Sequence, residues 1–430
     1  MRAGRLVLRF GRLSGALDGC RWGGREMLAP GSELRPNFWR APTDNDLGWG
    51  SPEKLRVWRH ASPPSLRGVT LLSSGVVRRT EQTVCVLSTW RLERPARLSP
   101  AEQAEKAREG GRCGVGANQS CVSCMHTVRA SEPSVRVTCR YLPGASVRPG
   151  KPLPRFGLTL ALARRFSRLS WFGAGPHETY ADRRSAARLG VFEGEVSAQV
   201  HPYLRPQESG NKVGVRWLAL REEGGGEDGQ AVVFSSPRGH PALSASASHF
   251  AVSDLDVPER GGAGLGAAAL IMTHHLTRPR EVQRHAAELT SRNFTTVCLD
   301  RAQMGLGGVN SWGAKPRPMH LLPREDPIEV TVEIHLAGKR ELPRLVHKLG
   351  AERGRPAAAA GGRADRCRFP REQSLQKYAR RANTSTEARG GGYDVPERGG
   401  GGGRSGARGG GRGGGRHRRI GGRGRRRARP

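Results

Sequence analysis

Two segments of this chain place carboxylates at spacings that could support acid–base chemistry. Asp44 and Asp46 lie in RAPTDND, and Glu178 and Asp182 lie in PHETYADR. Retaining glycosidases use two carboxyl groups about 5 Å apart, one as nucleophile and the other as acid and base. The structural alternative is that short acidic side chains in turns bond backbone amides and the arginines of the same segments, Arg40 and Arg183. We expect this structural role for all four and predict no catalytic residue in this chain.

Trp312 is the strongest candidate for a side chain that contacts a ligand. It lies in GLGGVNSWGAKPRP, where glycines let the backbone bend and Pro316 and Pro318 stiffen the exit. An aromatic ring in such a loop can stack on the apolar face of a pyranose. The alternative is a Trp that anchors the loop to the core, and the residues alone favour that alternative.

The cysteines give little support for a metal site or a disulfide framework. The chain has 8 of them, irregularly spaced, which favours a reducing compartment. Cys121 and Cys124 form a C-x-x-C near Cys113 and His126, but zinc ligands normally come in paired spacings and no second pair follows. The N-terminus does not resemble a secretory signal, and no long apolar run suggests a membrane helix. We predict no metal, no cofactor and a cytoplasmic location.

Short strands separated by Gly and Pro are expected to position these side chains. Leu6, Leu8 and Phe10 alternate with Val7, Arg9 and Gly11, so one face is more apolar, and similar short runs recur along the chain. This pattern predicts an all-β fold, a large antiparallel β-sandwich over residues 1–345, with insertions near 94–125 and 256–277. Within it, four aromatics are expected to be core or interface residues: Phe38, Trp39, Trp171 and Trp217.

The C-terminal tail differs in composition from the rest of the chain. The formal net charge is +34, and the residues from Glu387 to Pro430 include 13 Arg and 3 acids. Residues 351–430 are mostly Gly, Arg and Ala, too poor in apolar side chains to offset the entropy of ordering, so we expect disorder. Arg-Gly runs can bind RNA, although Tyr393 is one of few aromatics here. Codon bias in a GC-rich genome explains the arginines equally well.

Seven segments between Leu6 and Leu336 follow one another in a recognisable order. They are RPNFWRAPTDND at Arg35–Asp46, WFGAGPHETYADR at Trp171–Arg183, SAARLGVFEG at Ser185–Gly194, PYLRPQESGN at Pro202–Asn211, VRWLAL at Val215–Leu220, SASHF at Ser246–Phe250 and QMGLGGVNSWGAKPRP at Gln303–Pro318. In this order the series resembles the C-terminal domain of the large bacterial-type β-galactosidases of glycoside hydrolase family two. The same domain is the small chain where that enzyme is made as two chains.

The resemblance implies a fold, a partner and a role for Trp312. The family's domain is a galactose-mutarotase-like β-supersandwich, and both catalytic glutamates lie on a barrel that this chain lacks. In the family, the Trp at the position of Trp312 reaches into the barrel's active site as a sugar platform. The complete enzymes commonly use Mg²⁺ and Na⁺. Two departures are notable: Val309 and Asn310 replace an acidic pair, and Thr179 and Ala181 alter an Asn-Tyr-Pro-Asp motif.

Three functions follow as hypotheses. The first is a β-galactosidase small chain, or a fragment of a longer product, that helps hydrolyse terminal β-D-galactosides such as lactose by completing a partner's active site. The second is a non-catalytic carbohydrate-binding protein that kept the sandwich without the enzyme. The third is nucleic-acid binding through the Arg/Gly tail.

Overall fold

Alternating apolar residues build the strands of this chain. In the computed structural model, β2 (Leu6–Phe10) buries Leu6 and Leu8 and exposes Val7 and Arg9, as its sequence predicts. The structure describes residues 2–3, 5–92, 119–144, 147, 151–256, 285–310 and 313–354. Within these ranges every pair of neighbouring strands is antiparallel, which confirms the predicted all-β antiparallel class.

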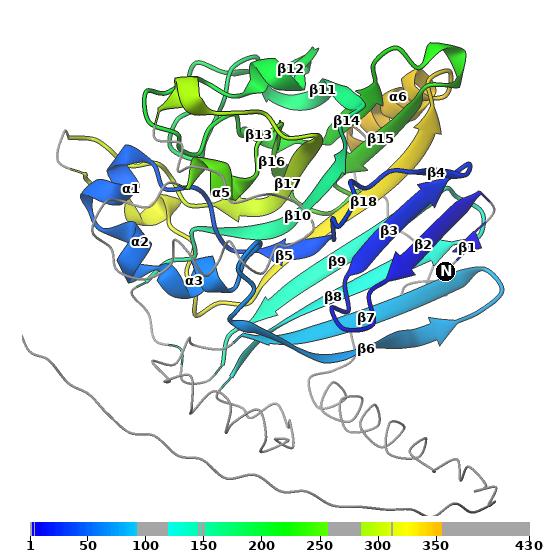
Figure 1. Cartoon of the computed structure of the whole chain (residues 1–430), viewed down its shortest axis with the longest axis horizontal. Coiled ribbons are helices and arrows are strands. Elements are labelled where there is room, and N and C mark those ends of the chain that lie inside the picture. The colour runs from blue at the N-terminus through cyan, green and yellow to red at the C-terminus, as the bar shows by residue number, and fades with distance from the viewer. Residues whose placement is uncertain are drawn as a thin grey trace, which may run out of the picture. The chain divides into compact units, whose positions relative to one another are not determined.

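The described strands form three sheets (Figure 1). The four-stranded sheet has the order β1 (Arg2–Ala3), β2, β3 (Leu17–Trp22) and β4 (Arg25–Glu26). The five-stranded sheet has the order β13 (Lys212–Val215), β16 (Leu243–Ser248), β17 (Phe294–Gln303), β10 (Arg155–Ala163) and β5 (Arg35–Asn37). The nine-stranded sheet has the order β12 (Arg188–Glu195), β11 (Phe166–Gly175), β14 (Trp217–Glu222), β15 (Gln230–Ser235), β18 (Ile328–Gly338), β9 (Ser134–Leu142), β8 (Ser120–Arg129), β7 (Thr83–Leu92) and β6 (Val69–Arg79).

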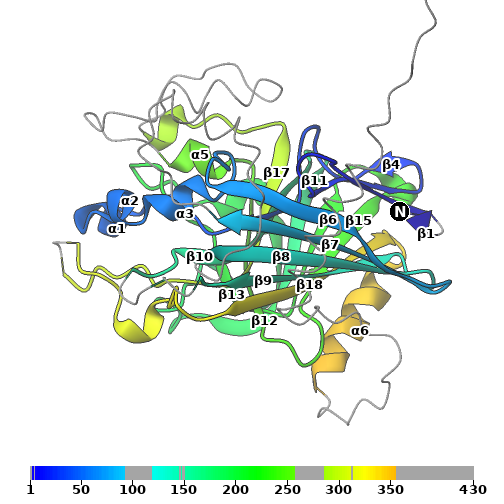
Figure 2. The same cartoon turned by 90° about the horizontal axis from the view of Figure 1, so that it is seen from below.

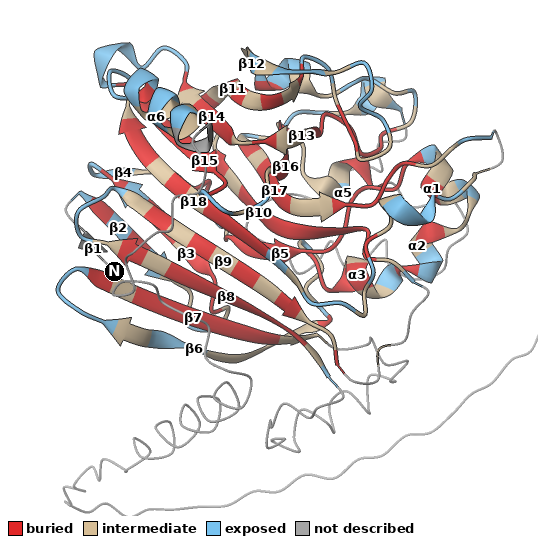
Figure 3. Ribbon diagram, turned by 180° about the vertical axis from the view of Figure 1, so that it is seen from behind, coloured by how far each residue is buried: buried red, intermediate tan, exposed pale blue. Residues whose placement is uncertain are grey.

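The core lies between the five-stranded and nine-stranded sheets, because both send apolar side chains into one buried cluster. Leu158 and Leu299 come from β10 and β17, and Val137 and Val332 come from β9 and β18. Figure 3 shows buried residues running along the central strands of both sheets. The arrangement is a β-sandwich, as predicted.

Aromatic residues fill the centre of this core. The four that the sequence assigns to the interior are all buried: Phe38, Trp39, Trp171 and Trp217. Phe38 is fully buried, and its ring contacts those of Trp58, Tyr141 and Phe156 at centroid distances of 5.5, 5.9 and 5.4 Å. Because Tyr141 belongs to β9 and Phe156 to β10, Phe38 joins the two sheets.

Helices are short and lie outside the sheets. Three follow β5, namely α1 (Asp44–Gly48), α2 (Ser51–Lys54) and α3 (Arg56–His60), and α5 (Val252–Leu255) follows β16. Single 3₁₀ turns lie at Val196–Gln199, Gly226–Asp228, Ala286–Glu288 and Pro318–His320. In Figure 2, α1 to α3 lie at the end of the sandwich opposite to α6 (Leu342–Gly354).

Helix α6 was not among the elements predicted from the sequence. This helix crosses the predicted boundary between the sandwich, 1–345, and the tail, 351–430. It packs Leu342, Leu345 and Leu349 on the outer face of β14 and β15, where Trp217 and Val233 lie. The tail beyond residue 354, with its predicted disorder and RNA contact, lies outside the described residues.

Two other predictions need correction. Residues 120–125, assigned to an insertion near 94–125, belong to β8, a strand inside the nine-stranded sheet. β8 also pairs Cys124 with Cys139 of β9 in a disulfide, a bond that the prediction of no disulfide framework and a reducing compartment did not include. The register of two strands separated by a turn brings these cysteines together, and their spacing alone does not reveal it. Residues 93–118 and 257–284, the bulk of both predicted insertions, lie outside the described residues.

Candidate functional site

The candidate site is the group of residues that anchors the loop carrying Trp312. We call this group the bed of the loop; it comprises Arg40, Asn45, Asp46 and Asp182 together with the two flanks of the loop. Trp312 itself, with Ser311, lies outside the described residues, but both flanks of the loop are described. The loop leaves β17 after Gln303 and returns toward β18 through the 3₁₀ turn at Pro318–His320. Its position therefore depends on what holds residues 304–310 and 313–318.

Asp182 holds the first flank through its carboxylate. Oδ1 accepts a hydrogen bond from the Leu306 amide and Oδ2 accepts one from the Gly307 amide, both at 2.9 Å. Asp182 lies in the tight turn after Tyr180, whose amide and carbonyl both pair with Arg183. The two oxygens thus fix two consecutive peptide units. Bonds from N–H groups to a charged carboxylate are among the stronger hydrogen bonds in proteins.

Arg40 holds the two carbonyls that precede those amides. Its Nη1 donates to the Met304 carbonyl at 2.5 Å, and its Nη2 donates to the Gly305 carbonyl at 2.9 Å. The guanidinium also forms a two-pronged ion pair with Asp46, with Nε–Oδ2 and Nη2–Oδ1 distances of 3.1 and 3.0 Å. Both side chains of this pair are only 1% exposed. A buried charge pair is tolerated when its remaining donors and acceptors are satisfied, as they are for this guanidinium.

Asp46 is placed by the start of α1. Thr43 is the N-cap: its Oγ1 accepts from the Asp46 amide at 3.2 Å, and Asp46 Oδ2 accepts from the Thr43 amide at 3.1 Å. This is a capping box, which a Thr followed three residues later by an acid can form. The same carboxylate therefore caps a helix and orients Arg40. The residue before Asp46 in the first turn, Asn45, donates from Nδ2 to the Leu306 carbonyl at 3.4 Å.

The second flank closes on the first and on α1. The Gly308 amide donates to the Ala314 carbonyl at 2.9 Å, which closes the base of the segment 309–313 that includes Trp312. Gly308 has φ +78°, and a Cβ there would lie 2.1 Å from Asn45 Nδ2. Gly313 has φ +73°, and its Cβ would lie 2.6 Å from the Gly48 backbone. Only glycine allows this close approach to α1 without strain.

A buried charged layer lies beneath the bed, in the strands that lead to it. Arg155 of β10 places Nη2 3.0 Å from Asp300 Oδ2 and 3.4 Å from Glu208 Oε1. Burial raises the pKa of the Asp300 carboxyl to about 7, although the charge of Arg155 acts in the opposite direction. Burial also raises the pKa of the neighbouring Tyr180 and lowers that of Lys212 to about 8. No local sequence pattern signals this layer, because its members come from segments far apart in the chain, and it was not predicted.

Comparison with known proteins places this bed in a family. Residues 2–334 match the family model described as "Beta galactosidase small chain". The chain belongs to the β-galactosidase small-chain family. This confirms the resemblance drawn from the seven segments, three of which supply the bed.

Relatives of this small-chain family member are longer proteins. The chain is 28% identical over 298 residues to a "Beta-galactosidase" of Priestia megaterium. This match covers 69% of this chain and 22% of that protein. It is 30% identical over 318 residues to a "Beta-galactosidase" of Lactobacillus delbrueckii subsp. bulgaricus, covering 74% and 25%. The chain thus spans about a quarter of the length of these relatives.

Solved structures show only distant likeness to the small-chain sandwich. An alpha-mannosidase from Enterococcus faecalis V583 gives a TM-score of 0.41 at 8% identity, covering 82% of this chain and 30% of that one. A galactose mutarotase-like protein from Clostridium acetobutylicum gives a TM-score of 0.39 at 8% identity, covering 79% and 94%. Neither adds to the fold described above.

The carboxylates of this small-chain sandwich are engaged as the structural alternative predicted. Asp46 pairs with Arg40, and Asp182 binds loop amides. Glu178 pairs with Arg183, and its Oε2 accepts from the Gly210 amide at 2.7 Å. Asp44 Oδ2 accepts from Gln207 Nε2 at 2.8 Å. The predicted pairing of these carboxylates with Arg40 and Arg183 is confirmed. The two hydrogen bonds of Asp182 to the amides of the Trp312 loop were not predicted.

Neither a metal cluster nor a membrane helix is found in the part of the chain that the structure describes. No three His, Cys, Asp or Glu side chains there are grouped so that they could hold a metal ion. No helix in the same residues is long and apolar enough to span a membrane.

Proposed function

We propose that this chain supplies a sugar platform, Trp312, to the active site of a β-galactosidase. The catalytic carboxylates would lie on a barrel domain of a partner chain, or of an upstream part of a longer protein. The substrates would be terminal β-D-galactosides such as lactose. The names of the relatives and the family model support the activity, and the short span of this chain relative to them supports the need for a partner.

The observation that carries the proposal is the anchorage of the loop around Trp312. Arg40 and Asp182 hold four consecutive residues before the tip, and the Gly308–Ala314 bond closes the base. Fixing the backbone of one residue costs roughly 1–2 kcal/mol. Flanks that are held before the sugar arrives do not incur that cost on binding, so more of the stacking energy is available to the substrate.

The experiment that tests the proposal is complementation of a truncated relative. The β-galactosidase of Lactobacillus delbrueckii, with its region matching this chain removed, is mixed with the full 430-residue chain and assayed on a chromogenic β-galactoside. We expect no turnover by either part alone and turnover by the mixture. Robust turnover by the isolated 430-residue chain would overturn the proposal. Failure to restore turnover, together with sugar binding by the isolated chain, would favour a non-catalytic carbohydrate-binding protein.

The role of Trp312 is tested in the active mixture. Trp312→Ala removes about 2 kcal/mol of apolar contact with the sugar, so we expect KM to rise roughly 30-fold. Trp312→Phe keeps an aromatic face and should recover most of this loss. Equal KM values in the parent, the Phe variant and the Ala variant would refute the platform role.

A further inference from the structure

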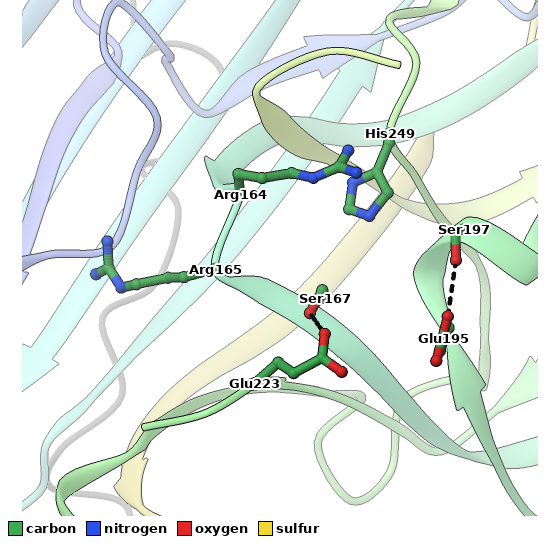
Figure 4. A pocket seen from close by; sticks show the side chains of 7 residues that line it. All are labelled: Arg164, Arg165, Ser167, Glu195, Ser197, Glu223 and His249. Carbon is green, nitrogen blue, oxygen red and sulfur yellow. Dashed lines mark hydrogen bonds between the residues drawn. The ribbon is translucent and has the colours of Figure 1, made fainter. Parts of the chain in front are cut away.

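A cavity of about 440 Å³ lies among loops remote in sequence from the Trp312 loop (Figure 4). Arg164 and Arg165 form the turn between β10 and β11, Ser167 lies at the start of β11, and Glu223 follows β14. Glu195 is the last residue of β12, Ser197 lies in the 3₁₀ turn that follows it, and His249 follows β16. All of these residues line the cavity. Its volume is within the usual range of small-molecule sites, about 300–1,000 Å³.

Hydrogen bonds hold the walls of the cavity in place. The Glu223 amide donates to the Arg165 carbonyl at 3.2 Å, which ties β14 to the β10–β11 turn. The Arg292 amide donates to the His249 carbonyl at 2.7 Å, and Arg164 Nη1 donates to the Arg292 carbonyl at 2.9 Å. Arg164 and His249 therefore share one wall, where Figure 4 shows their side chains beside each other. The cavity is built from ordered backbone segments.

The polar groups of the walls keep hydrogen-bonding capacity. Ser167 donates to Glu223 Oε2 at 2.8 Å, and Ser197 donates to Glu195 Oε2 at 3.1 Å. Each carboxylate can accept further bonds, because two oxygens offer about four sites. The bond from Arg164 to the Arg292 carbonyl uses one of the five guanidinium N–H donors. Donors and acceptors thus face the same space.

His249 adds an acceptor to this set. Its Nδ1 lies 3.1 Å from the Phe294 carbonyl, which can only accept, so Nδ1 carries the proton. Burial lowers the pKa of His249, opposed by the bond to Phe294 and assisted by the charge of Arg164. The ring is therefore neutral near pH 7, and Nε2 is an acceptor.

The charges around the cavity balance. Figure 4 shows Arg165 turned away from the other six side chains, and it forms an ion pair with Glu222 instead. Glu195 pairs with Arg168 at 3.1 Å. This leaves one cation, Arg164, and one anion, Glu223, in the described walls. A strongly charged ligand would gain no net attraction here, whereas hydroxyl groups, which both donate and accept, match the mixture.

We propose that this cavity binds a neutral polyhydroxylated ligand of monosaccharide size. Carboxylates of Glu195 and Glu223 accept from ligand hydroxyls, and the Arg164 guanidinium donates to a ring or hydroxyl oxygen. No aromatic ring other than His249 lines the described walls, so recognition relies on hydrogen bonds and the affinity is in the millimolar range. The site does not depend on the β-galactosidase proposal, because none of its residues belongs to the bed of the Trp312 loop.

The test measures binding to the full 430-residue chain carrying Trp312→Ala, so that the loop contributes nothing. Galactose, glucose and myo-inositol are titrated by saturation-transfer NMR and calorimetry, with acetate and inorganic phosphate as anionic probes. We expect the polyols to bind and the charged probes not to bind. Glu223→Gln, which replaces a charged acceptor, and Ser167→Ala should each weaken polyol binding, the former about tenfold. Glu193→Gln on β12 is the matched control, because Glu193 is exposed and pairs with Arg221 outside the cavity.

Specific results would overturn the site. No saturation transfer to any polyol at millimolar concentration would refute it, as would equal affinities of Glu223→Gln, Ser167→Ala and the parent. Preferential binding of phosphate or acetate would refute the neutral ligand class. Thermal melting of each variant identifies a folding defect, and the small, surface-directed Ser167→Ala change keeps the test decisive if Glu223→Gln does not fold.

Discussion

The carboxylate of Asp182 can be tested directly, because both of its oxygens bind backbone amides. In Asp182→Asn, Oδ1 still accepts one N–H, but the new NH₂ group faces the other N–H as a second donor. One charge-assisted bond is lost, worth about 1.5–3 kcal/mol, and the remaining bond becomes neutral and weaker. We take about 2 kcal/mol as the loss in local stability at Leu306 and Gly307, whose amides lie 2.9 Å from the two oxygens.

The assay is amide hydrogen exchange in the isolated chain, which needs no partner and no activity. A loss of about 2 kcal/mol should speed exchange at Leu306 and Gly307 roughly 30-fold, since 1.4 kcal/mol is a factor of ten. Exchange in the central strands should not change. Asp326→Asn is the matched control, because Asp326 is an exposed acid in the turn before β18. Unchanged exchange at Leu306 and Gly307 in Asp182→Asn would refute the anchoring role.

Three further predictions concern the core, the buried charges and the tail. Phe38→Ala leaves a cavity between the sheets and should cost about 3–5 kcal/mol in urea unfolding, with Phe38→Leu losing less; a loss below that of Phe38→Leu would contradict the packing. The pKa of Asp300 is raised to about 7 from an ordinary 3.8, so protonation of this carboxyl favours the folded state. Its contribution to the free energy of unfolding is therefore full below about pH 4 and is lost as pH rises through about 7. Asp300→Asn should remove this slope from unfolding free energies measured against pH, and an identical slope in the variant would contradict the titration. Deleting 388–430 should abolish RNA retention at moderate salt if the tail binds nucleic acid, and undiminished retention would exclude the tail.

The strands were predictable where one face of the strand is buried. Leu6 and Leu8 of β2 alternate with exposed neighbours, and this period of two can be read without a structure. The same is true of α6 in retrospect, since Leu342, Leu345, Val346 and Leu349 follow the spacing of one helix face. The low apolar content of the following tail masked that signal in the sequence.

The bed of the Trp312 loop was predictable only in part. The pairing of Arg40 with Asp46 is local, and a Thr with an acid three residues later indicates the capping box that orients it. By contrast, Asp182 lies 124 residues before Leu306 in the sequence. Arg155 is also remote in sequence from both Glu208 and Asp300, with which it forms ion pairs. Such contacts are set by sheet order and register, which single-sequence patterns do not encode.

The polar groups of the bed match the polarity of the peptide chain that they hold. The cation Arg40 binds the carbonyls of Met304 and Gly305, and the anion Asp182 binds the amides of the next two residues. Each charge therefore meets the end of the peptide dipole that it stabilises, and exchanging either for a neutral group would weaken only its own half of this four-residue contact. These residues come from Arg35–Asp46, Trp171–Arg183 and Gln303–Pro318, three of the segments by which the family was recognised in sequence. A fourth, Pro202–Asn211, contributes Gln207, which bonds to Asp44 at the start of α1. The ordered motifs are thus distant parts of one structural unit, which explains why they identify the family more clearly than the strands do.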